Sequence, residues 1–421
     1  MIDDVQNVIL LSLDALRADH LSCYGYDRDT SPTLDELAAD NLMCANAFSA
    51  SSHTREAVAS LLTGEHPNRA AGTNYQLAAE PISSVAQRAG LTCGGFHSNP
   101  FVSRAYGFDE GFDVFDDDLH LGQHKIIALA QRVLDKLRNR HYARAEIINE
   151  RAFKWLDSLE DVDRFFLWNH YMDTHGPYEP PAEYRERYTD EYISDRTAGS
   201  LYKRAIKDPE SITDAEHKLL VDYYDAEIRY IDDRLADFFE SLRRRDLLDD
   251  SLVIITADHG DAFGEHDYYE HPRQLHEELV HVPLIVVHPD IEPATIETAV
   301  STTDIVATIS QVLGEPPCGV GESLFDLSHT DGDRTVFQQA RGENESAHIR
   351  RFAARTKDET AYGQYDTNTE TVTVDSASSD AIGEALLSHI REQSATSPSE
   401  DAAEEAPNEE IEQRLSALGY K

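Results

Sequence analysis

Two places in the sequence carry residue types that bind divalent cations. Asp14 ends a run of mostly apolar residues, and Asp258 and His259 stand together at the end of a second apolar run. Gly260 follows the pair and allows a sharp turn. A carboxylate and an imidazole at such a turn can face one cation that accepts both oxygen and nitrogen ligands. Asp14 alone is equally well explained as a helix cap, so the predicted metal site depends on both places together.

A group of hydroxyl residues provides a candidate nucleophile. Ser51, Ser52 and Thr54 precede an apolar, helix-like stretch that ends in Thr-Gly. If Thr54 caps a helix that starts near Arg55, its hydroxyl lies at the positive end of the helix dipole, where backbone N–H groups attract an anion. Such a hydroxyl could attack a phosphoryl or sulfuryl centre, but it needs a metal or a base to lose its proton. The alternative is a plain capping threonine, and the candidate metal ligands favour the nucleophile.

The segment HYMDTHGPYEPP, residues 170–181, places His170, Asp173 and His175 after a third apolar run. Its Gly-Pro and Pro-Pro pairs stiffen the loop. A stiff loop suits side chains that must be held in place for proton transfer or anion binding. The alternative is a proline-rich surface loop with solvated histidines.

Four apolar runs predict the strands that position these residues. They are continuous rather than alternating, which is typical of parallel strands buried on both faces. Each run is followed by polar residues, and in open α/β sheets ligands bind beyond the carboxyl ends of the strands. The four strand ends therefore predict one shared site. The runs are residues 7–13, 91–96, 164–169 and 251–257.

Helices are predicted between these strands. Apolar residues recur at helical spacing over 145–159 and 220–242, and Ser31 and Pro32 suit the start of a helix over 31–41. These apolar stripes are core faces to which we assign no chemistry.

The chain divides into three predicted parts. Residues 1–342 form one catalytic α/β domain. Residues 343–391 contain short β-prone segments separated by turns, which predicts a small antiparallel β subdomain with a closing helix from about Ser379. Residues 392–421 are acidic and rich in Ser and Pro, which predicts a largely disordered tail whose last residues can dock.

The composition is strongly acidic, with 37 Lys and Arg against 79 Asp and Glu and a formal net charge of −42. Such a surface repels nucleic acid and anionic membranes, so neither is an expected partner. The charge fits a disordered acidic chain or a folded protein adapted to molar salt, and the apolar strands and 9% aromatic residues favour the latter. No apolar run reaches the ~20 residues of a membrane span, and no basic leader precedes the first strand. We therefore expect a halophilic, cytoplasmic protein without a membrane span, and its oligomeric state stays open.

With its motifs in this order, the chain resembles the sulfatase family of the alkaline-phosphatase superfamily, in a haloarchaeal form, over most of residues 7–345. The resemblance implies an α/β fold: an alkaline-phosphatase-like three-layer sandwich with a mostly parallel central sheet, helices on both faces and a small C-terminal antiparallel sheet. It is carried by NVILLSLDALRADHLSCYGY, ASLLTGEHP, NPFVSRAYGFDEGFD, HYMDTHGPYEPP, TADHGDAFGEH and EELVHVPLIV, and by the ending RLSALGY.

The resemblance also implies roles for individual residues. His175 matches a histidine that contacts the transferred group or protonates the leaving oxygen, and His271 falls where many members have lysine. His259 matches a position where the family carries Asn or His as a metal ligand. The implied sites are catalytic residues Thr54, His175 and His271; substrate-binding residues Arg17, His97, Asn99 and Asp173; and metal ligands Asp14, Thr54, Asp258 and His259.

The chain departs from the family at the nucleophile. Sulfatases use a cysteine or serine, oxidised to formylglycine, nine residues before the Thr of LTG. Counting back from Thr63 gives Thr54, which cannot become formylglycine, so none is expected. An alignment that makes Ser51 the nucleophile needs a three-residue insertion and is the alternative.

Three further departures suggest a second class of function. Glu56 and Val58 stand where the family signature has proline and arginine, and Ala15 replaces the usual second aspartate. Glu56 would place negative charge near an anionic substrate. These residues fit a catalytically degenerate member that binds an anionic glycan or metabolite without turnover.

The leading prediction is a metal-dependent hydrolase or transferase of phosphate or sulfate esters carried by a small molecule or a glycan. Threonine nucleophiles occur in this superfamily among phosphodiesterases, nucleotide pyrophosphatases and phosphoglycerol or phosphoethanolamine transferases, so phosphoesters are favoured. A true sulfuric ester hydrolase is the alternative enzyme. One divalent ion (Mn, Mg, Ca or Zn) is expected, and the candidate ligands of a second ion are Asp173, His175, His266 and His271.

Overall fold

The computed structural model describes residues 5–118, 142–160, 164–329, 332–375 and 379–395. A central eight-stranded sheet has the order β11-β2-β10-β7-β1-β6-β4-β5. β10 runs antiparallel to β7 and β2, and the other neighbouring pairs run parallel, so the predicted, mostly parallel sheet is confirmed. The strands are β1 (Asn7–Leu13), β2 (Leu42–Cys44), β4 (Thr92–His97), β5 (Val114–Asp116), β6 (Phe165–Tyr171), β7 (Ser251–Ala257), β10 (Leu284–Val287) and β11 (Ala294–Ile296).

The strand register brings the ends of β1, β6 and β7 together. Leu13 pairs with Tyr171 on one side and with Ala257 on the other. The residues that follow β1 and β7 therefore lie next to each other at the carboxyl edge of the sheet. β6 was expected to end before His170, yet it continues to Tyr171, because His170 pairs with His97 of β4 inside the ladder.

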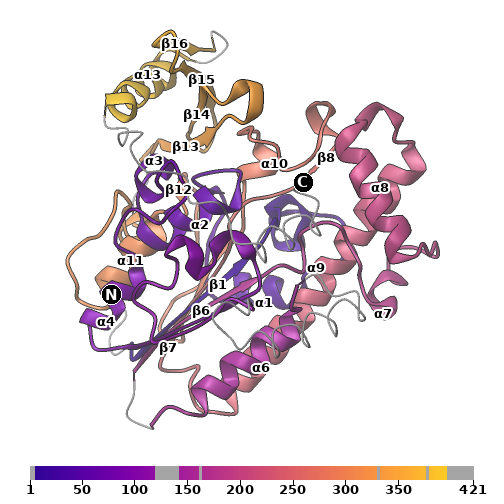
Figure 1. Ribbon diagram of the computed structural model, residues 1–421. Coiled ribbons are helices and arrows are strands. Elements are labelled where there is room, and N and C mark those ends of the chain that lie inside the picture. The colour runs from indigo at the N-terminus through magenta and orange to yellow at the C-terminus, as the bar shows by residue number, and fades with distance from the viewer. Residues whose placement is uncertain (1–4, 119–141, 161–163, 330–331, 376–378, 396–421) are drawn as a thin grey trace.

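Helices cover both faces of the sheet, as predicted (Figure 1). Ile9 and Leu11 of β1 pack with α1 (Pro32–Asp40), α6 (Ala145–Leu156) and α9 (Asp214–Arg243). Val8 and Leu10 point to the other face, whose core includes α2 (Thr54–Thr63), α4 (Ile82–Arg88) and α11 (Asp304–Val312). α9 begins six residues before the predicted start at Leu220, because Thr213 and Glu216 form a capping box that starts the helix earlier.

The described residues also form two small sheets and further helices. Two small sheets pair β3 (Ala47–Phe48) with β12 (Val300–Ser301), and β8 (Ala262–Phe263) with β9 (Tyr269–Glu270). The other α-helices are α3 (Pro67–Ala70), α7 (Ala182–Arg185), α8 (Asp195–Lys207), α10 (Glu277–Val280) and α12 (Leu324–Leu327). The 3-10 helices are η1 (Ala18–His20), η2 (Ser22–Tyr24), η3 (Pro100–Val102), η4 (Arg104–Tyr106), η5 (Pro209–Ser211), η6 (Glu265–Asp267) and η7 (Asn344–Ser346).

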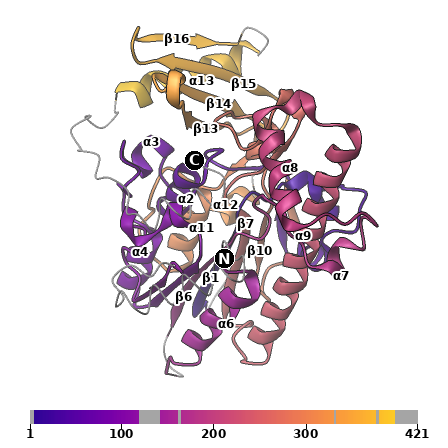
Figure 2. The same cartoon turned by 45° about the vertical axis from the view of Figure 1, so that its right-hand side comes forward.

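A separate antiparallel sheet lies beyond the central domain, next to α2 and α3 (Figure 2). Its order is β13-β14-β15-β16, with strands β13 (Val336–Arg341), β14 (Ile349–Arg355), β15 (Thr360–Asp366) and β16 (Thr371–Val374). One face packs on α13 (Asp380–Ala395) through Phe352, Ile382 and Leu386. The small C-terminal sheet is thus confirmed, and its first strand precedes residue 342. Residues 396–421, where the acidic tail was predicted, lie outside the described part.

Within the described ranges, the structure contains no helix with the length and apolar character needed to cross a membrane.

Candidate functional site

Asp14 and Asp258 form the centre of a buried group at the carboxyl edge of the sheet. Asp258 Oδ1 accepts hydrogen bonds from the backbone N–H of Ala15 (3.2 Å) and of His259 (2.9 Å). Ala15 has a φ of 59°, and this left-handed turn follows β1 directly. Among the described residues, Asp14 Oδ1 and Asp258 Oδ2 have no hydrogen-bond partner. Two buried carboxylate oxygens without donors are satisfied either by a bound cation or by a proton.

His259 presents a lone pair to these two oxygens. Its Nδ1–H donates to the carbonyl of Gly260 at 2.8 Å, which leaves Nε2 unprotonated in the neutral ring. Nε2 lies 3.6 Å from Asp14 Oδ1 and 3.5 Å from Asp258 Oδ2. The ligand atoms of the three residues all lie within 4.8 Å of one another, which fits one divalent ion.

Gly260 is required because the backbone of α10 leaves no room for a side chain at this position. A Cβ at this position would lie 2.1 Å from the carbonyl oxygen of Glu278. Its backbone N–H donates to Leu279 O at 2.9 Å. The close approach to α10 therefore fixes the turn that carries Asp258 and His259.

The electrostatics of the pair also fit a cation. Burial raises the pKa of Asp14, but the charge of His175 and the hydrogen bond from His170 bring that pKa well below its ordinary value. Burial and the charge of Asp14 raise the pKa of Asp258 to about 8. Two buried carboxylates this close cannot both ionise near neutral pH unless a positive charge lies between them.

The second oxygen of Asp14 is held by side chains from β6 and the loop after β4. Asn99 Nδ2 donates to Asp14 Oδ2 at 2.6 Å, and His170 Nε2 lies 3.3 Å from the same oxygen. Trp168 Nε1 donates to Ser12 Oγ at 3.0 Å, and this hydroxyl lies 2.9 Å from His170 Nδ1. This chain lets Ser12 donate to His170, so that His170 Nε2 carries the proton that faces Asp14. Asn99, which was predicted to bind substrate, orients the carboxylate of Asp14.

Thr54 is the first residue of α2, and the N-cap is His53. The prediction that Thr54 itself caps the helix was off by one residue, because the extended backbone ends at His53. The Thr54 hydroxyl lies 3.0 Å from His259 Nε2. It therefore joins the Asp14–Asp258–His259 group at the positive end of α2. The alternative nucleophile, Ser51, points to Glu56 Oε2 at 3.5 Å.

His175 and His271 meet beside this group. His175 Nδ1–H donates to Gly176 O at 2.6 Å, and the Nε2 atoms of the two rings lie 3.0 Å apart. Burial lowers the pKa of His175, but the negative charges of Asp14 and Asp261 more than offset this and raise it. Burial and the neighbouring His259 and His175 hold the pKa of His271 well below its ordinary value. A protonated His175 can therefore donate through Nε2 to a neutral His271.

Arg17 lies at the edge of the site with its own partners. It donates to Asp19 (2.7 Å), to Glu265 (2.8 Å) and to the carbonyl of Asp261 (3.0 Å). The carboxylate of Asp261 accepts from Tyr178. Asp261 was not selected from the sequence, although it is the last acidic residue of the DHGD segment. Its charge next to His175 makes it a member of the site.

Asp173 and His97, both predicted to bind substrate, lie in other surroundings. Asp173 forms a buried ion pair with Arg144 at 2.9 Å, and Arg144 also pairs with Glu227. His97 Nδ1 accepts from the backbone N–H of Asn99 at 3.2 Å, and its ring packs on Trp168. Asp173 thus holds a buried arginine in place, and His97 supports the backbone of the loop after β4.

Glu56 does not present an isolated charge to the site. It is fully buried and pairs with Arg273 Nη1 at 2.7 Å and with Arg341 Nε at 2.8 Å. Arg341 belongs to β13, so these pairs connect α2 to the C-terminal sheet. The repulsion expected between Glu56 and an anionic substrate is thus offset by two guanidinium groups.

Replacing Glu56 by alanine is expected to lower the free energy of unfolding by about 3–5 kcal/mol, because Arg273 and Arg341 would stay largely buried without their carboxylate. Denaturant unfolding followed by tryptophan fluorescence measures this change. The control is Glu343→Ala, which removes a partner of Arg273 whose side chain is 51% exposed and should cost no more than about 1 kcal/mol. Equal losses in the two variants would contradict the buried-pair interpretation.

The chain is similar to known proteins in both sequence and fold. Residues 6–315 match the family model described as Sulfatase. The chain is 24% identical over 378 residues to the uncharacterized sulfatase YidJ of Escherichia coli, covering 81% of this chain and 74% of that one. It is 22% identical over 350 residues to the choline-sulfatase of Rhizobium meliloti, covering 73% and 67%. The crystal structure of a phosphonate monoester hydrolase of Agrobacterium radiobacter superposes with a TM-score of 0.71 at 17% identity, covering 93% of this chain and 96% of that one.

Proposed function

The chain belongs to the sulfatase family, whose members are ester hydrolases, and on that premise we propose that it cleaves or transfers phosphate esters with Thr54 as the nucleophile. The observation that supports this most is the position of the Thr54 hydroxyl. It lies 3.0 Å from His259 Nε2, in a group whose two carboxylate oxygens have no donor among the described residues. A hydroxyl next to an oxygen and nitrogen ligand set can be activated as a nucleophile.

One divalent ion would be held by Asp14 Oδ1, Asp258 Oδ2, His259 Nε2 and Thr54 Oγ1. When bound there, Mn, Mg, Ca or Zn supplies Lewis-acid chemistry that makes hydroxyl deprotonation easier and offsets the negative charge of the ester. Asn99 and His170 fix the orientation of Asp14, and the Gly260 carbonyl fixes that of His259.

The chain's own residues then divide the reaction between them. Thr54 Oγ forms a bond to phosphorus, the bond to the leaving oxygen breaks, and the proton of the hydroxyl passes to solvent. His175 Nε2–H protonates the leaving oxygen. The N-terminus of α2 stabilises the negative oxygens of the transferred group. Water or an alcohol resolves the phosphothreonine, which gives hydrolysis or transfer.

The nucleophile favours phosphorus over sulfur. Threonine cannot form the formylglycine of sulfate ester hydrolysis, and relatives of both chemistries occur, a choline-sulfatase and a phosphonate monoester hydrolase. A sulfuric ester hydrolase is therefore the second candidate. The pairing of Glu56 with Arg273 and Arg341 weakens the case for a degenerate binding protein.

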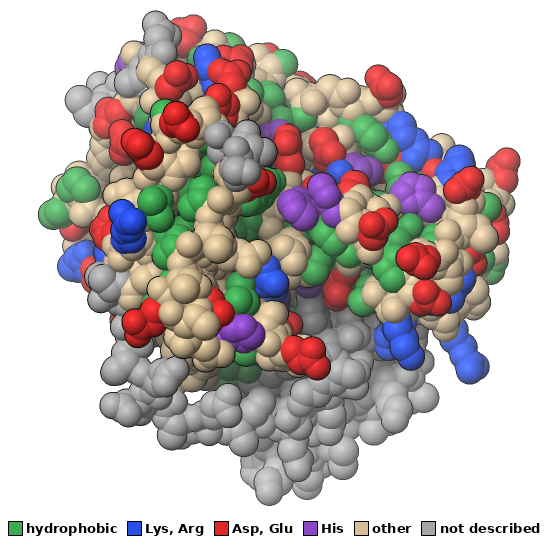
Figure 3. Space-filling model, turned by 90° about the horizontal axis from the view of Figure 1, so that it is seen from above, with side chains coloured by type: hydrophobic (Ala, Val, Ile, Leu, Met, Phe, Trp, Pro, Cys, Tyr) green, Lys and Arg blue, Asp and Glu red, His purple; other side chains and the backbone are tan. Residues whose placement is uncertain are grey.

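The surface supports a salt-rich working environment. Acidic side chains are spread over the face shown in Figure 3, in keeping with a net charge of −42. Molar salt screens the repulsion between them, and we infer a halophile's cytoplasm as the compartment.

A substrate panel in molar KCl tests the proposal. A phosphodiester, a phosphonate monoester, a phosphate monoester and an aryl sulfate are offered with each of the four cations. We expect at least one phosphorus ester to exceed the aryl sulfate in kcat/KM by tenfold or more, roughly 1.4 kcal/mol in the barrier. A preference for the aryl sulfate would favour the second candidate. Saturable binding without turnover of any ester would favour a degenerate member.

Replacing His175 by glutamine is expected to lower kcat about 10²–10⁴-fold for an alkyl phosphoester and far less for a 4-nitrophenyl ester, whose leaving group needs no proton. Because the pKa of His175 is raised, its acid form persists to a higher pH than that of an ordinary imidazole, and the rate should fall as the pH rises through that pKa. This limb of the pH profile should vanish in the variant. Burial holds the pKa of His53 well below its ordinary value, so His53→Gln should keep the limb. An equal loss for both leaving groups would exclude His175 as the acid.

A further inference from the structure

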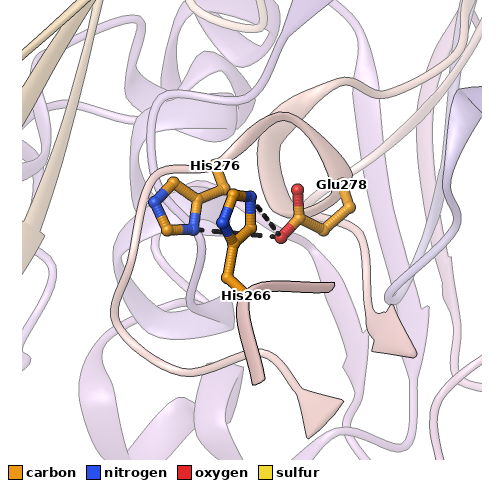
Figure 4. A group of neighbouring side chains, drawn as sticks. All are labelled: His266, His276 and Glu278. Atoms are coloured by element: carbon orange, nitrogen blue, oxygen red, sulfur yellow. Dashed lines mark ion pairs between the residues drawn. The ribbon is translucent and has the colours of Figure 1, made fainter. Parts of the chain in front are cut away.

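A second group of potential metal ligands lies apart from the site described above. Figure 4 shows the side chains of His266, His276 and Glu278, which point toward one another. Glu278 Oε1 lies 3.8 Å from His266 Nε2 and 3.9 Å from His276 Nδ1. The three ligand atoms all lie within 4.8 Å of one another.

The backbone holds these residues in place. His266 has a φ of 57° and Asp267 a φ of 63°, so both lie in the left-handed region. Two successive left-handed residues, neither of them glycine, are uncommon. This conformation sets the ring of His266 against that of His276, with 3.8 Å between the ring centroids. His276 is the N-cap of α10 and Glu278 lies in its first turn.

A phenol bridges the two inner ligands. Tyr268 Oη lies 2.6 Å from His276 Nδ1 and donates to Glu278 Oε1 at 2.7 Å. His276 Nδ1 and Glu278 Oε1 are therefore both oriented toward the Tyr268 oxygen. The side chain of Glu278 is 8% exposed and that of His266 is 54% exposed, so the group is closed on the inside and open to solvent on the outside.

We propose that His266 Nε2, His276 Nδ1 and Glu278 Oε1 form a surface site for a zinc-like divalent transition-metal ion, with water in the open position. Two imidazoles and one carboxylate are a ligand set for Zn²⁺ or Co²⁺, whereas Mg²⁺ and Ca²⁺ prefer oxygen atoms. Ligand atoms around a tetrahedral zinc lie about 3.3 Å apart, so small side-chain rotations and release of the Tyr268 hydroxyl are needed. Because Tyr268 donates its hydrogen to Glu278, His276 Nδ1 donates to Tyr268, and this proton moves to Nε2 through solvent when the ion binds. No residue is shared with the Asp14–Asp258–His259 group.

An ion at this site would connect two segments of the fold and stabilise their arrangement. It joins η6 to the start of α10. The segment between them contains His271, whose Nε2 faces His175, and α10 also holds Gly260 through Leu279. An ion bound here should therefore raise the melting temperature by mass action, since the unfolded chain lacks the preformed ligand set.

The experiment uses the full chain with Asp258→Asn, which disables the first metal group, after treatment with a chelator. Zn²⁺ is titrated calorimetrically in molar KCl, and Co²⁺ absorption reports nitrogen ligation. We expect one equivalent to bind and the melting temperature to rise. Adding His266→Ala or His276→Ala should weaken binding by about 100-fold or more. Adding His329→Ala, an exposed histidine of the loop after α12, should leave binding unchanged.

The same titration of the otherwise unmodified chain guards against misfolding of the Asp258 variant. Two equivalents should bind, and one should remain after His266→Ala. Zn²⁺ binding that persists unchanged in both histidine variants would overturn the proposal. Displacement by equimolar Ca²⁺ or Mg²⁺ would also overturn it, because the ion would then be held by the acidic surface.

Discussion

Thr54→Ala is expected to reduce kcat/KM by about 10⁴-fold or more, with the fold unchanged. The substitution removes the hydroxyl that lies 3.0 Å from His259 Nε2 and keeps a small residue at the first position of α2. Because the side chain is 1% exposed and its hydroxyl has no capping role, little stability should be lost. Thr54→Ser keeps an equivalent hydroxyl and should retain a measurable part of the activity.

Ser51→Ala is the matched control for the nucleophile. Ser51 is equally buried and three residues away, but its hydroxyl faces Glu56. Its loss should change kcat/KM by less than about tenfold, the range of a lost neutral hydrogen bond. Mapping of a trapped phosphoryl adduct by mass spectrometry should find it on Thr54. An adduct on Ser51, or full activity of Thr54→Ala, would refute the assignment.

The central sheet could be predicted from the sequence because its signal is local. β1 and β7 are mostly apolar runs, and both were predicted with their observed bounds. β4 and β6 end later than predicted, because His97 and His170 sit inside the ladder and a polar residue gives no apolar signal there. The strand β13 lies before residue 342, the predicted boundary between the catalytic domain and the C-terminal subdomain. The boundary is misplaced because the composition of a strand does not reveal which sheet it joins.

The meeting of Asp14 with Asp258 and His259 could also be predicted, since parallel strands end at one edge. The roles of the surrounding side chains could not. Asn99 lies 85 residues from Asp14, and which of its neighbours it reaches depends on the path of the loop after β4.

Charged pairs between distant parts of the chain could not be predicted either. Glu56 looked like an obstacle to an anionic substrate because Arg273 and Arg341 come from distant parts of the chain. His266 was a candidate ligand from the sequence, but its pairing with His276 could not be predicted, because no glycine marks the left-handed turn that brings the two rings together.

Asp258→Asn is expected to have opposite effects on activity and on the stability of the metal-free protein. Activity should fall by about 10³-fold, since the variant would lose one of the anionic ligands proposed to hold the cation, and the cation is what would offset the negative charge developing on the transferred group. The amide keeps an Oδ1 that can accept from Ala15 and His259, and its NH₂ can donate to the oxygen of Asp14 that lacks a partner. The variant should therefore fold.

The sign of the stability change follows from the pKa of Asp258, raised from 3.8 to about 8 by burial and by Asp14. The folded metal-free protein holds this proton more tightly than the unfolded chain does. Its stability is therefore unaffected below pH 3.8, falls as the pH rises above that value, and levels off above about 8. The asparagine does not titrate, so at pH 8 the metal-free variant should be more stable than the metal-free parent.

Chemical denaturation at pH 5 and pH 8, with chelator and with saturating Mn²⁺, measures how the stability depends on pH and on the bound ion. With chelator, the variant's advantage should be larger at pH 8 than at pH 5. With Mn²⁺ the order should reverse, because the ion stabilises only the chain that binds it at this site. His329→Asn serves as the control for a substitution remote from both metal groups and should match the parent in all four conditions. A variant that is less stable than the parent with chelator at both pH values would mean that the two carboxylates do not repel each other, and that no cation is needed between them.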